Sequence, residues 1–151
     1  MLRVSAKGML VVVIMALAFM ITPVRAEGFA GGSGTAADPY LIETAEQFNT
    51  IRYNLTAHYK LTTDIDLSGY ENWEPIGTAN APFVGALDGT GHTIGGLSID
   101  RSINDVGLFG SIAGNSRLEN ITLHIGAGGI KGRDRVGGLA GSASCTNGLI
   151  R

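Results

Sequence analysis

Residues 106–110 read VGLFG and residues 136–141 read VGGLAG. Each stretch closes with an apolar residue, a second residue and a glycine, and the same pattern occurs at residues 83–85 as FVG. The closing glycines are Gly85, Gly110 and Gly141, so the pattern recurs at a roughly regular interval. Such a period is typical of repeat proteins. We expect these glycines to occupy equivalent positions in successive coils, where a Cβ would be costly.

A second apolar pattern accompanies the glycines. Two groups of three apolar residues have the same internal spacing, three positions and then two. The second group follows the first by nearly the interval that separates Gly85 from Gly110. The groups are Ile94, Leu97 and Ile99, then Leu118, Ile121 and Leu123. A period of roughly 24 to 31 positions is too short for a βαβ unit of ~30 or more residues. It fits one coil of a β-solenoid, which stacks only on its neighbours.

Alternation of apolar and polar residues predicts strands. Residues 59–67 alternate throughout, which predicts one strand with an apolar face, and residues 121–125 alternate in the same way. Glycine-rich stretches between these runs predict turns, at residues 88–91, 95–96, 114–115 and 126–129. The expected fold class is all-β. A β-solenoid fits best, and a β-sandwich is the alternative because it too has short alternating strands.

One short helix is predicted before the first strand. Thr44 is a candidate N-cap, and Gln47 three residues later completes a capping-box pattern. One apolar stripe follows at helical spacing, formed by Ala45, Phe48, Ile51 and Leu55. We expect this helix to cover the open end of the solenoid, because uncapped repeat ends expose apolar surface and strand edges.

Residues 1–26 have the composition of a signal peptide. Arg3 and Lys7 precede an uncharged run at residues 8–21, and Ala26 ends a small-residue cleavage pattern before Glu27. An uncleaved signal anchor is the alternative. Without this segment the formal net charge is −5, which does not favour nucleic acid or an anionic membrane as a partner.

The stretches at 106–110 and 136–141 resemble the GLUG motif, named for its Gly-Leu-hydrophobic-Gly core. Upstream segments extend the resemblance to roughly residues 31–144: GGSGT…DPYLI, YKL…DIDL, WEPIG, LDGTGHTI and GLSI. GLUG repeats occur in bacterial cell-surface proteins, including adhesin-like proteins and some immunoglobulin A peptidases. The resemblance implies a right-handed parallel β-helix. Together with the apolar-x-Gly pattern, which adds Gly85, it gives the structural repeat positions: Gly85, Leu108, Gly110, Leu139 and Gly141.

In those peptidases the chemistry belongs to a zinc domain marked His-Glu-x-x-His, and this sequence has no such motif. GLUG proteins also run on through many repeats. Here Leu149 stands at the same spacing after Gly141 as Leu118 does after Gly110, so another coil begins. The chain stops at Arg151, two residues later. We therefore expect a truncated solenoid whose last residues, from about 132, fray and whose open C-terminal end promotes self-association.

Few residues are candidates for binding. Asp64 and Asp66 lie two apart on the expected strand, so both carboxylates would leave one face. A solvated face explains them better than a Ca²⁺ site, because Ca²⁺ takes about six to eight oxygen ligands. Trp73, with Tyr70 and Tyr40, is a candidate carbohydrate-stacking platform, and burial under the cap is the alternative.

Other candidate groups favour structure over chemistry. The turn at 88–92, DGTGH, resembles turns of pectin-degrading β-helix enzymes. No second acid accompanies Asp88 in the repeat, although glycosidases need two placed carboxylates, so a turn Asp bonded to its own backbone is the better explanation. Cys145 is the sole cysteine, so it forms no internal disulfide. We predict no catalytic residues, no metal and no cofactor.

The sequence thus predicts a signal peptide at 1–26, an N-terminal cap with a short helix at 27–58 and a β-solenoid at 59–151. The predicted function is that of an exported bacterial protein, secreted or at the cell surface, acting as a scaffold, spacer or adhesive surface. Its expected partner is a host or matrix protein or a glycan. A carbohydrate-active β-helix enzyme is the alternative, favoured if three or more acidic groups converge in one groove.

Overall fold

The computed structural model describes residues 28–151. The predicted signal peptide and its cleavage site lie outside the described residues. The described chain is all-β apart from one short helical segment, α1 (Ala45–Asn49) with the 3₁₀ turn η1 (Thr50–Tyr53). Its strands are short: β1 (Tyr40–Ile42), β2 (His58–Leu61), β3 (Ile65–Asp66), β4 (Ala86–Asp88), β5 (Thr93–Asp100), β6 (Phe109–Gly114), β7 (Arg117–Glu119), β8 (Thr122–Lys131), β9 (Ala140–Cys145) and β10 (Leu149–Ile150).

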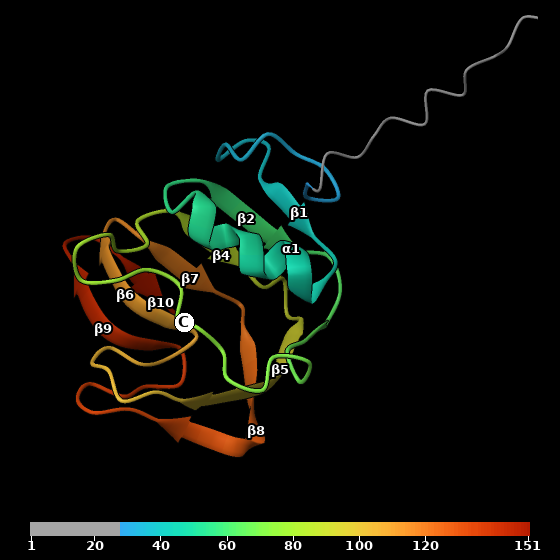
Figure 1. Cartoon of the computed structure of the whole chain (residues 1–151). Helices are drawn as coiled ribbons and strands as arrows, with labels where there is room; N and C mark the ends of the chain where they lie inside the picture. Colours follow the sequence, from blue (N-terminus) through green and yellow to red (C-terminus); the bar gives the residue numbers. More distant parts are fainter. Residues whose placement is uncertain (1–27) are drawn as a thin grey trace, which may run out of the picture.

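The strands form three parallel sheets, in the orders β1-β2-β4-β7-β10, β3-β5-β8 and β6-β9. From β2 onward, consecutive strands along the chain fall in different sheets, and each strand pairs with the strand one coil earlier or later (Figure 1). This arrangement confirms the β-solenoid, with about three turns. It excludes the β-sandwich, whose neighbouring strands run antiparallel.

Apolar side chains stack in rows through the solenoid core. One row runs from coil to coil through the partners Tyr59, Leu87 and Leu118, each almost fully buried. The aromatic side chains Phe83 and Phe109 pack with ring centroids 4.9 Å apart. Because every second residue of a strand points inward, the alternation in the sequence supplies these rows.

The N-terminal end is closed by α1, as predicted (Figure 1). The helix does not precede the first strand, however, because β1 comes before it and already pairs with β2. The Thr44 side chain accepts a hydrogen bond from the Gln47 amide, and the Gln47 side chain accepts one from the Thr44 amide, which completes the capping box. In the first coil the helical segment takes the place that strands occupy in later coils. Phe48 and Ile51 are fully buried, so the apolar stripe covers the end of the core.

The single strand predicted over 59–67 is wrong. The chain leaves β2 at Leu61, turns through residues 62–64 and enters a different sheet at β3. Leu61 and Ile65 both point into the core on either side of the corner. Inward and outward positions therefore keep alternating while the chain turns the corner, so the sequence pattern does not reveal the change of direction.

The repeat equivalence predicted for Gly85 is also wrong. Gly110 lies opposite Gly141 in the β6–β9 pair, and the bridge between Ile76 and Phe109 makes Gly77 the partner of Gly110 in the preceding coil. Gly85 stands before β4 in another sheet, opposite Ala57. A Cβ on Gly85 or on Gly110 would overlap a carbonyl oxygen of the preceding coil. The apolar-x-Gly pattern therefore marks two different positions in a coil at which the backbone lies close to the backbone of the preceding coil.

The second predicted repeat pattern needs the same correction. Ile94 pairs with Leu123 in the β5–β8 pair, whereas Leu118 pairs with Leu87 in a different sheet. The glycine-rich stretches at 95–96 and 126–129 are not turns between strands. They lie inside β5 and β8, where the register between the two strands shifts. Glycine tolerates the backbone irregularity of such bulges.

The last coil is less buried than the earlier ones. Ile125, Val136 and Ile150 are 46%, 46% and 49% exposed, whereas the partner of Ile150, Leu118, is fully buried. Among the described residues, β8 and β9 each pair with one strand only. This end of the described stack therefore presents apolar side chains and unpaired strand edges.

Candidate functional site

The two aspartates predicted as a pair have different hydrogen-bond partners. Asp64 lies in the corner between β2 and β3, where it accepts a hydrogen bond from the Thr93 amide at 2.8 Å and contacts His92 Nδ1 at 3.2 Å. Asp66 accepts a hydrogen bond from the Ser68 amide at 2.9 Å. These backbone hydrogen bonds lower the pKa of both carboxyls. Asp66 stabilises its own turn, whereas Asp64 joins the corner after β2 to the next coil.

Trp73 is fully buried, so it offers no face to a carbohydrate. Its Nε1–H donates to the carbonyl oxygen of Leu108 at 3.1 Å, and its ring centroid lies 5.9 Å from that of Phe48. The Arg52 guanidinium lies 5.5 Å from the Trp73 ring centroid. Trp73 therefore belongs to the capped core, so of the two alternatives burial under the cap is confirmed and the stacking platform is excluded.

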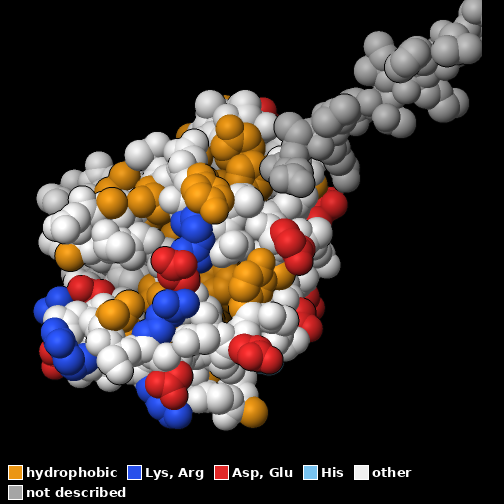
Figure 2. Space-filling view, viewed as in Figure 1, with side chains coloured by type: hydrophobic (Ala, Val, Ile, Leu, Met, Phe, Trp, Pro, Cys, Tyr) orange, Lys and Arg blue, Asp and Glu red, His pale blue; other side chains and the backbone are white. Residues whose placement is uncertain are grey.

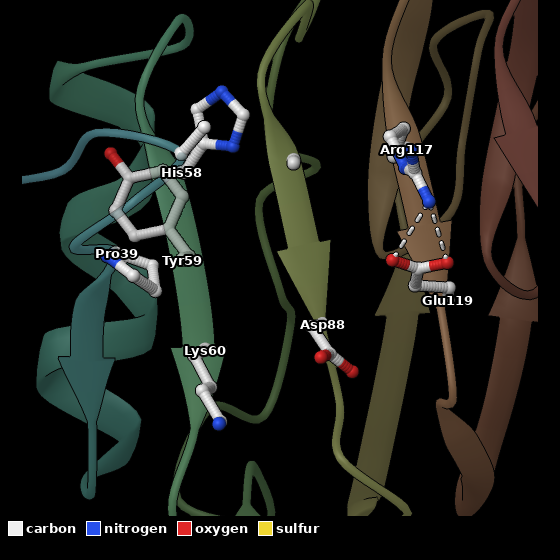
Figure 3. A pocket seen from close by; sticks show the side chains of 9 residues that line it. Pro39, His58, Tyr59, Lys60, Asp88, Arg117 and Glu119 are labelled. Atoms are coloured by element: carbon white, nitrogen blue, oxygen red, sulfur yellow. Dashed lines mark hydrogen bonds and ion pairs between the residues drawn. The ribbon is translucent and has the colours of Figure 1, made fainter.

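A polar hollow lies on the outer face of the largest sheet, where β2, β4 and β7 run side by side (Figure 3). Its volume is about 420 Å³. We name it the Ala86 groove, after the small residue at its floor. Its polar walls are His58, Lys60, Asp88, Arg117 and Glu119, and residues Ala36 and Pro39 form an apolar rim.

Strand register explains the hollow. His58, Ala86 and Arg117 are direct partners across β2, β4 and β7, so a methyl group stands between two long side chains. Lys60, Asp88 and Glu119 form the parallel row two positions further along. Outward positions alternate with the buried row of Leu87, which places both polar rows on one face.

The two carboxylates of the groove are held differently. Glu119 accepts hydrogen bonds from Arg117 Nη2 at 3.1 and 3.2 Å and from Arg151 Nη2 at 3.3 Å. Asp88 Oδ1 accepts from the Thr90 amide at 2.8 Å and from Asn120 Nδ2 at 2.9 Å. A second hollow of about 550 Å³ begins at Asp88 and extends the polar surface beyond the strand ends.

The side chains of Lys60 and His58 form no hydrogen bond or ion pair with another of residues 28–151. Their polar atoms and Asp88 Oδ2 therefore remain available to a ligand. No three His, Cys, Asp or Glu side chains in that range gather as a metal site would require. Cys145 is a free thiol, 3.2 Å from Ser116 Oγ in the neighbouring coil.

The sequence did contain a signal for Glu119. Gly110 and Gly141 are partners one coil apart, and the same offset from Asp88 leads to Glu119. The shorter offsets, from Gly85 to Gly110 and between the two apolar groups, join positions in different sheets and lead to no second acid beside Asp88. Asp88 itself bonds its own turn at the Thr90 amide, as the turn pattern predicted.

Many outward polar side chains bond to the neighbouring coil. These contacts join residues 28 to 32 positions apart, which is one coil: Asn72 with Asp100, Asp88 with Asn120, Asp100 with Lys131, Asn104 with Arg133, Asp105 with Arg135 and Glu119 with Arg151. Figure 2 shows basic and acidic side chains side by side over much of one face. We name this set the inter-coil ladder.

The comparisons with known proteins find two relatives. The chain is 43% identical over 103 residues, 63% of its length, to a protein of Evansella cellulosilytica with the provisional name Gly-rich membrane protein. It is 34% identical over 136 residues, 79% of its length, to halomucin of Haloquadratum walsbyi. The matches span 12% and 2% of those proteins.

No family model matches the chain, and no solved structure does. No helix among residues 28–151 is both long enough and apolar enough to span a membrane. The solenoid fold and the names of the two relatives are compatible with a surface protein.

Proposed function

We propose that this chain is a GLUG-type solenoid segment of an exported bacterial surface or secreted protein, and that it serves as a scaffold and adhesive surface without enzymatic activity. The inter-coil ladder carries this proposal. Outward polar side chains such as Asp100 and Asn104 are engaged with cations one coil away. Their contacts reinforce the stack, and they leave a polar exterior of the kind that repeat proteins use for binding.

A carbohydrate-active enzyme is the second candidate, because Asp88 and Glu119 stand on adjacent strands in one groove. Partner residues of adjacent strands lie about 4.8 Å apart, near the separation of retaining glycosidase carboxylates. Such an enzyme needs one carboxyl that delivers a proton to the leaving group. Guanidinium groups donate to both oxygens of Glu119, so the scaffold is the better supported function.

The test uses the full chain with a C-terminal epitope tag, expressed in a bacterium. We expect antibody to label intact cells, or the tagged product to appear in the medium, starting at Glu27. The purified product should leave a panel of plant and bacterial polysaccharides uncleaved. Retention in the cytosol would contradict export. Cleavage that Asp88→Asn abolishes and Asp134→Asn retains would make the chain an enzyme.

A further inference from the structure

We propose that the Ala86 groove binds a neutral oligosaccharide, laid across the strands along the solenoid axis. This inference rests on the adhesive part of the proposed function and gives it a ligand class. The groove has a closed floor, an apolar rim and polar walls on three successive strands. Figure 3 shows the side chains of His58, Lys60, Asp88 and Glu119 on the same side of the sheet.

The polar groups of the groove suit hydroxyl groups. Lys60 and Asp88 are direct partners on β2 and β4, so a free ammonium donor stands beside a free carboxylate oxygen. A sugar hydroxyl both donates and accepts hydrogen bonds, and it can satisfy the two together. Glu119 repeats the acceptor one strand further on. Successive strands are about 4.8 Å apart, a spacing close to the rise of one sugar in an extended chain.

Charge balance selects a neutral ligand. The groove contains two cations, Lys60 and Arg117, and two carboxylates, Asp88 and Glu119. A polyanion such as a uronic acid polymer would meet both carboxylates, and a basic peptide would meet both cations. A neutral sugar chain meets neither penalty. Ala86, Ala36 and Pro39 supply apolar surface for the C–H face of a ring.

The sheet itself disfavours a peptide. β2, β4 and β7 each have a strand partner on both sides, so their backbone groups are used within the sheet. An extended peptide gains affinity chiefly by pairing its own backbone with a free strand edge. The floor of the groove offers no such edge, and recognition must come from side chains.

The experiment is a calorimetric titration of the purified, exported full-chain product. The probes are cellohexaose, maltohexaose and mannohexaose, with hexagalacturonate and an alternating Lys-Glu hexapeptide as competitors. Two variants alter the groove. Ala86→Trp fills the floor of the groove. Lys60→Met removes an ammonium donor that forms no hydrogen bond or ion pair with another described residue. Two controls lie outside the groove at exposed positions on β8: Ala127→Trp and His124→Met.

We expect saturable binding of at least one neutral hexasaccharide. Ala86→Trp and Lys60→Met should each weaken it about tenfold or more, while both controls stay within about twofold. If Ala86→Trp fails to fold by circular dichroism, Lys60→Met decides. Tighter binding of hexagalacturonate or of the peptide would overturn the inference, as would equal binding by the groove variants. The inference would also be overturned if the folded chain bound none of the neutral probes. A chain that reaches the cell surface but binds no probe would contradict this inference and leave the scaffold proposal intact.

Discussion

Gly110 lies where the backbones of two successive coils approach each other closely. A Cβ there would overlap the carbonyl oxygen of Gly77 in the preceding coil, and neither backbone can move without shifting its sheet. Gly141 has the same constraint against the backbone at Asp105 and Val106. At these positions glycine is required by space.

Gly110→Ala should therefore lower the free energy of unfolding by about 2–3 kcal/mol. The matched control is Gly69→Ala, since Gly69 is exposed and a Cβ there would meet nothing within 4 Å. Urea denaturation followed by circular dichroism measures both variants. Equal stability of the two alanine variants would mean that the coils are not stacked in this register.

Asp105 carries a charge that the fold keeps ionised. Arg135 donates to both of its carboxylate oxygens, one at 2.8 Å, and this pairing lowers the pKa of Asp105. The residue is 8% exposed and has φ of 59°. Because the folded pKa lies below the unfolded value of about 3.9, the pair contributes stability above about pH 4. That contribution is lost as the pH falls through the folded pKa.

Asp105→Asn should cost about 1 kcal/mol at pH 7, and the difference from the unmodified chain should shrink below about pH 4. Asparagine tolerates the left-handed backbone, so the substitution tests the charge. Asp134→Asn is the control, because Asp134 and its partner Arg133 are both well exposed, with their atoms 3.8 Å apart. Urea denaturation at pH 7, 4.5 and 3 gives the comparison. A cost at pH 3 as large as at pH 7 would contradict the pairing.

At the scale of elements, α1 depends on its cap. The helix has only five residues, and isolated helices of this length are not stable in water. The capping box and the burial of Phe48 must therefore supply its stability.

Thr44→Ala removes the acceptor of the capping box and should cost about 1 kcal/mol. Thr63→Ala is the matched control, because Thr63 is exposed at the corner after β2. Thermal unfolding of the two variants distinguishes them. If Thr44→Ala unfolds at the temperature of the control, the helix is held by packing alone.

The elements that the sequence predicted are the local ones. Thr44 and Gln47 lie three positions apart, so a short pattern specifies the helix start. The corner at residues 62–64 left no such mark, because an alternating pattern is the same for a straight strand and for one that turns. The register was missed at Gly85 for a related reason. The apolar-x-Gly motif indicates where two coil backbones lie close together, but it does not indicate which sheet contains each contact.

The same limit explains the site. Asp88 was visible as a turn residue, but its neighbour Glu119 is set by the offset between β4 and β7. Coil lengths vary because loops of different length join the sheets, so one average period cannot pair side chains. Trp73 was ambiguous because an aromatic residue beside a cap suits both a surface platform and a buried contact.

At the scale of the whole molecule, the two ends of the described stack differ. Helix α1 covers one end, and β2 has a strand partner on both sides. At the other end β9 pairs only with β6 among the described residues, and nearby Val136 is 46% exposed. Fewer interfaces mean a lower free energy of local opening.

Amides at residues 140–145 should therefore exchange with solvent at least about tenfold faster than those of β2. Hydrogen exchange read by mass spectrometry measures this. We also propose that the open edge pairs with a second copy, so size-exclusion profiles should shift with concentration, and Val136→Lys should suppress the shift. Equal protection of both segments, in a strictly monomeric chain, would contradict both expectations.

The inter-coil ladder has a mechanical consequence. In a parallel solenoid the hydrogen bonds between coils point along the axis, so tension between residues 28 and 151 loads one coil boundary at a time. Contacts such as Asp105 with Arg135 rupture together with their own coil. Each release frees about 30 residues, or about 100 Å of extended chain at ~3.4 Å per residue. The molecule then lengthens in steps under load, and the peak force is set by its weakest remaining boundary.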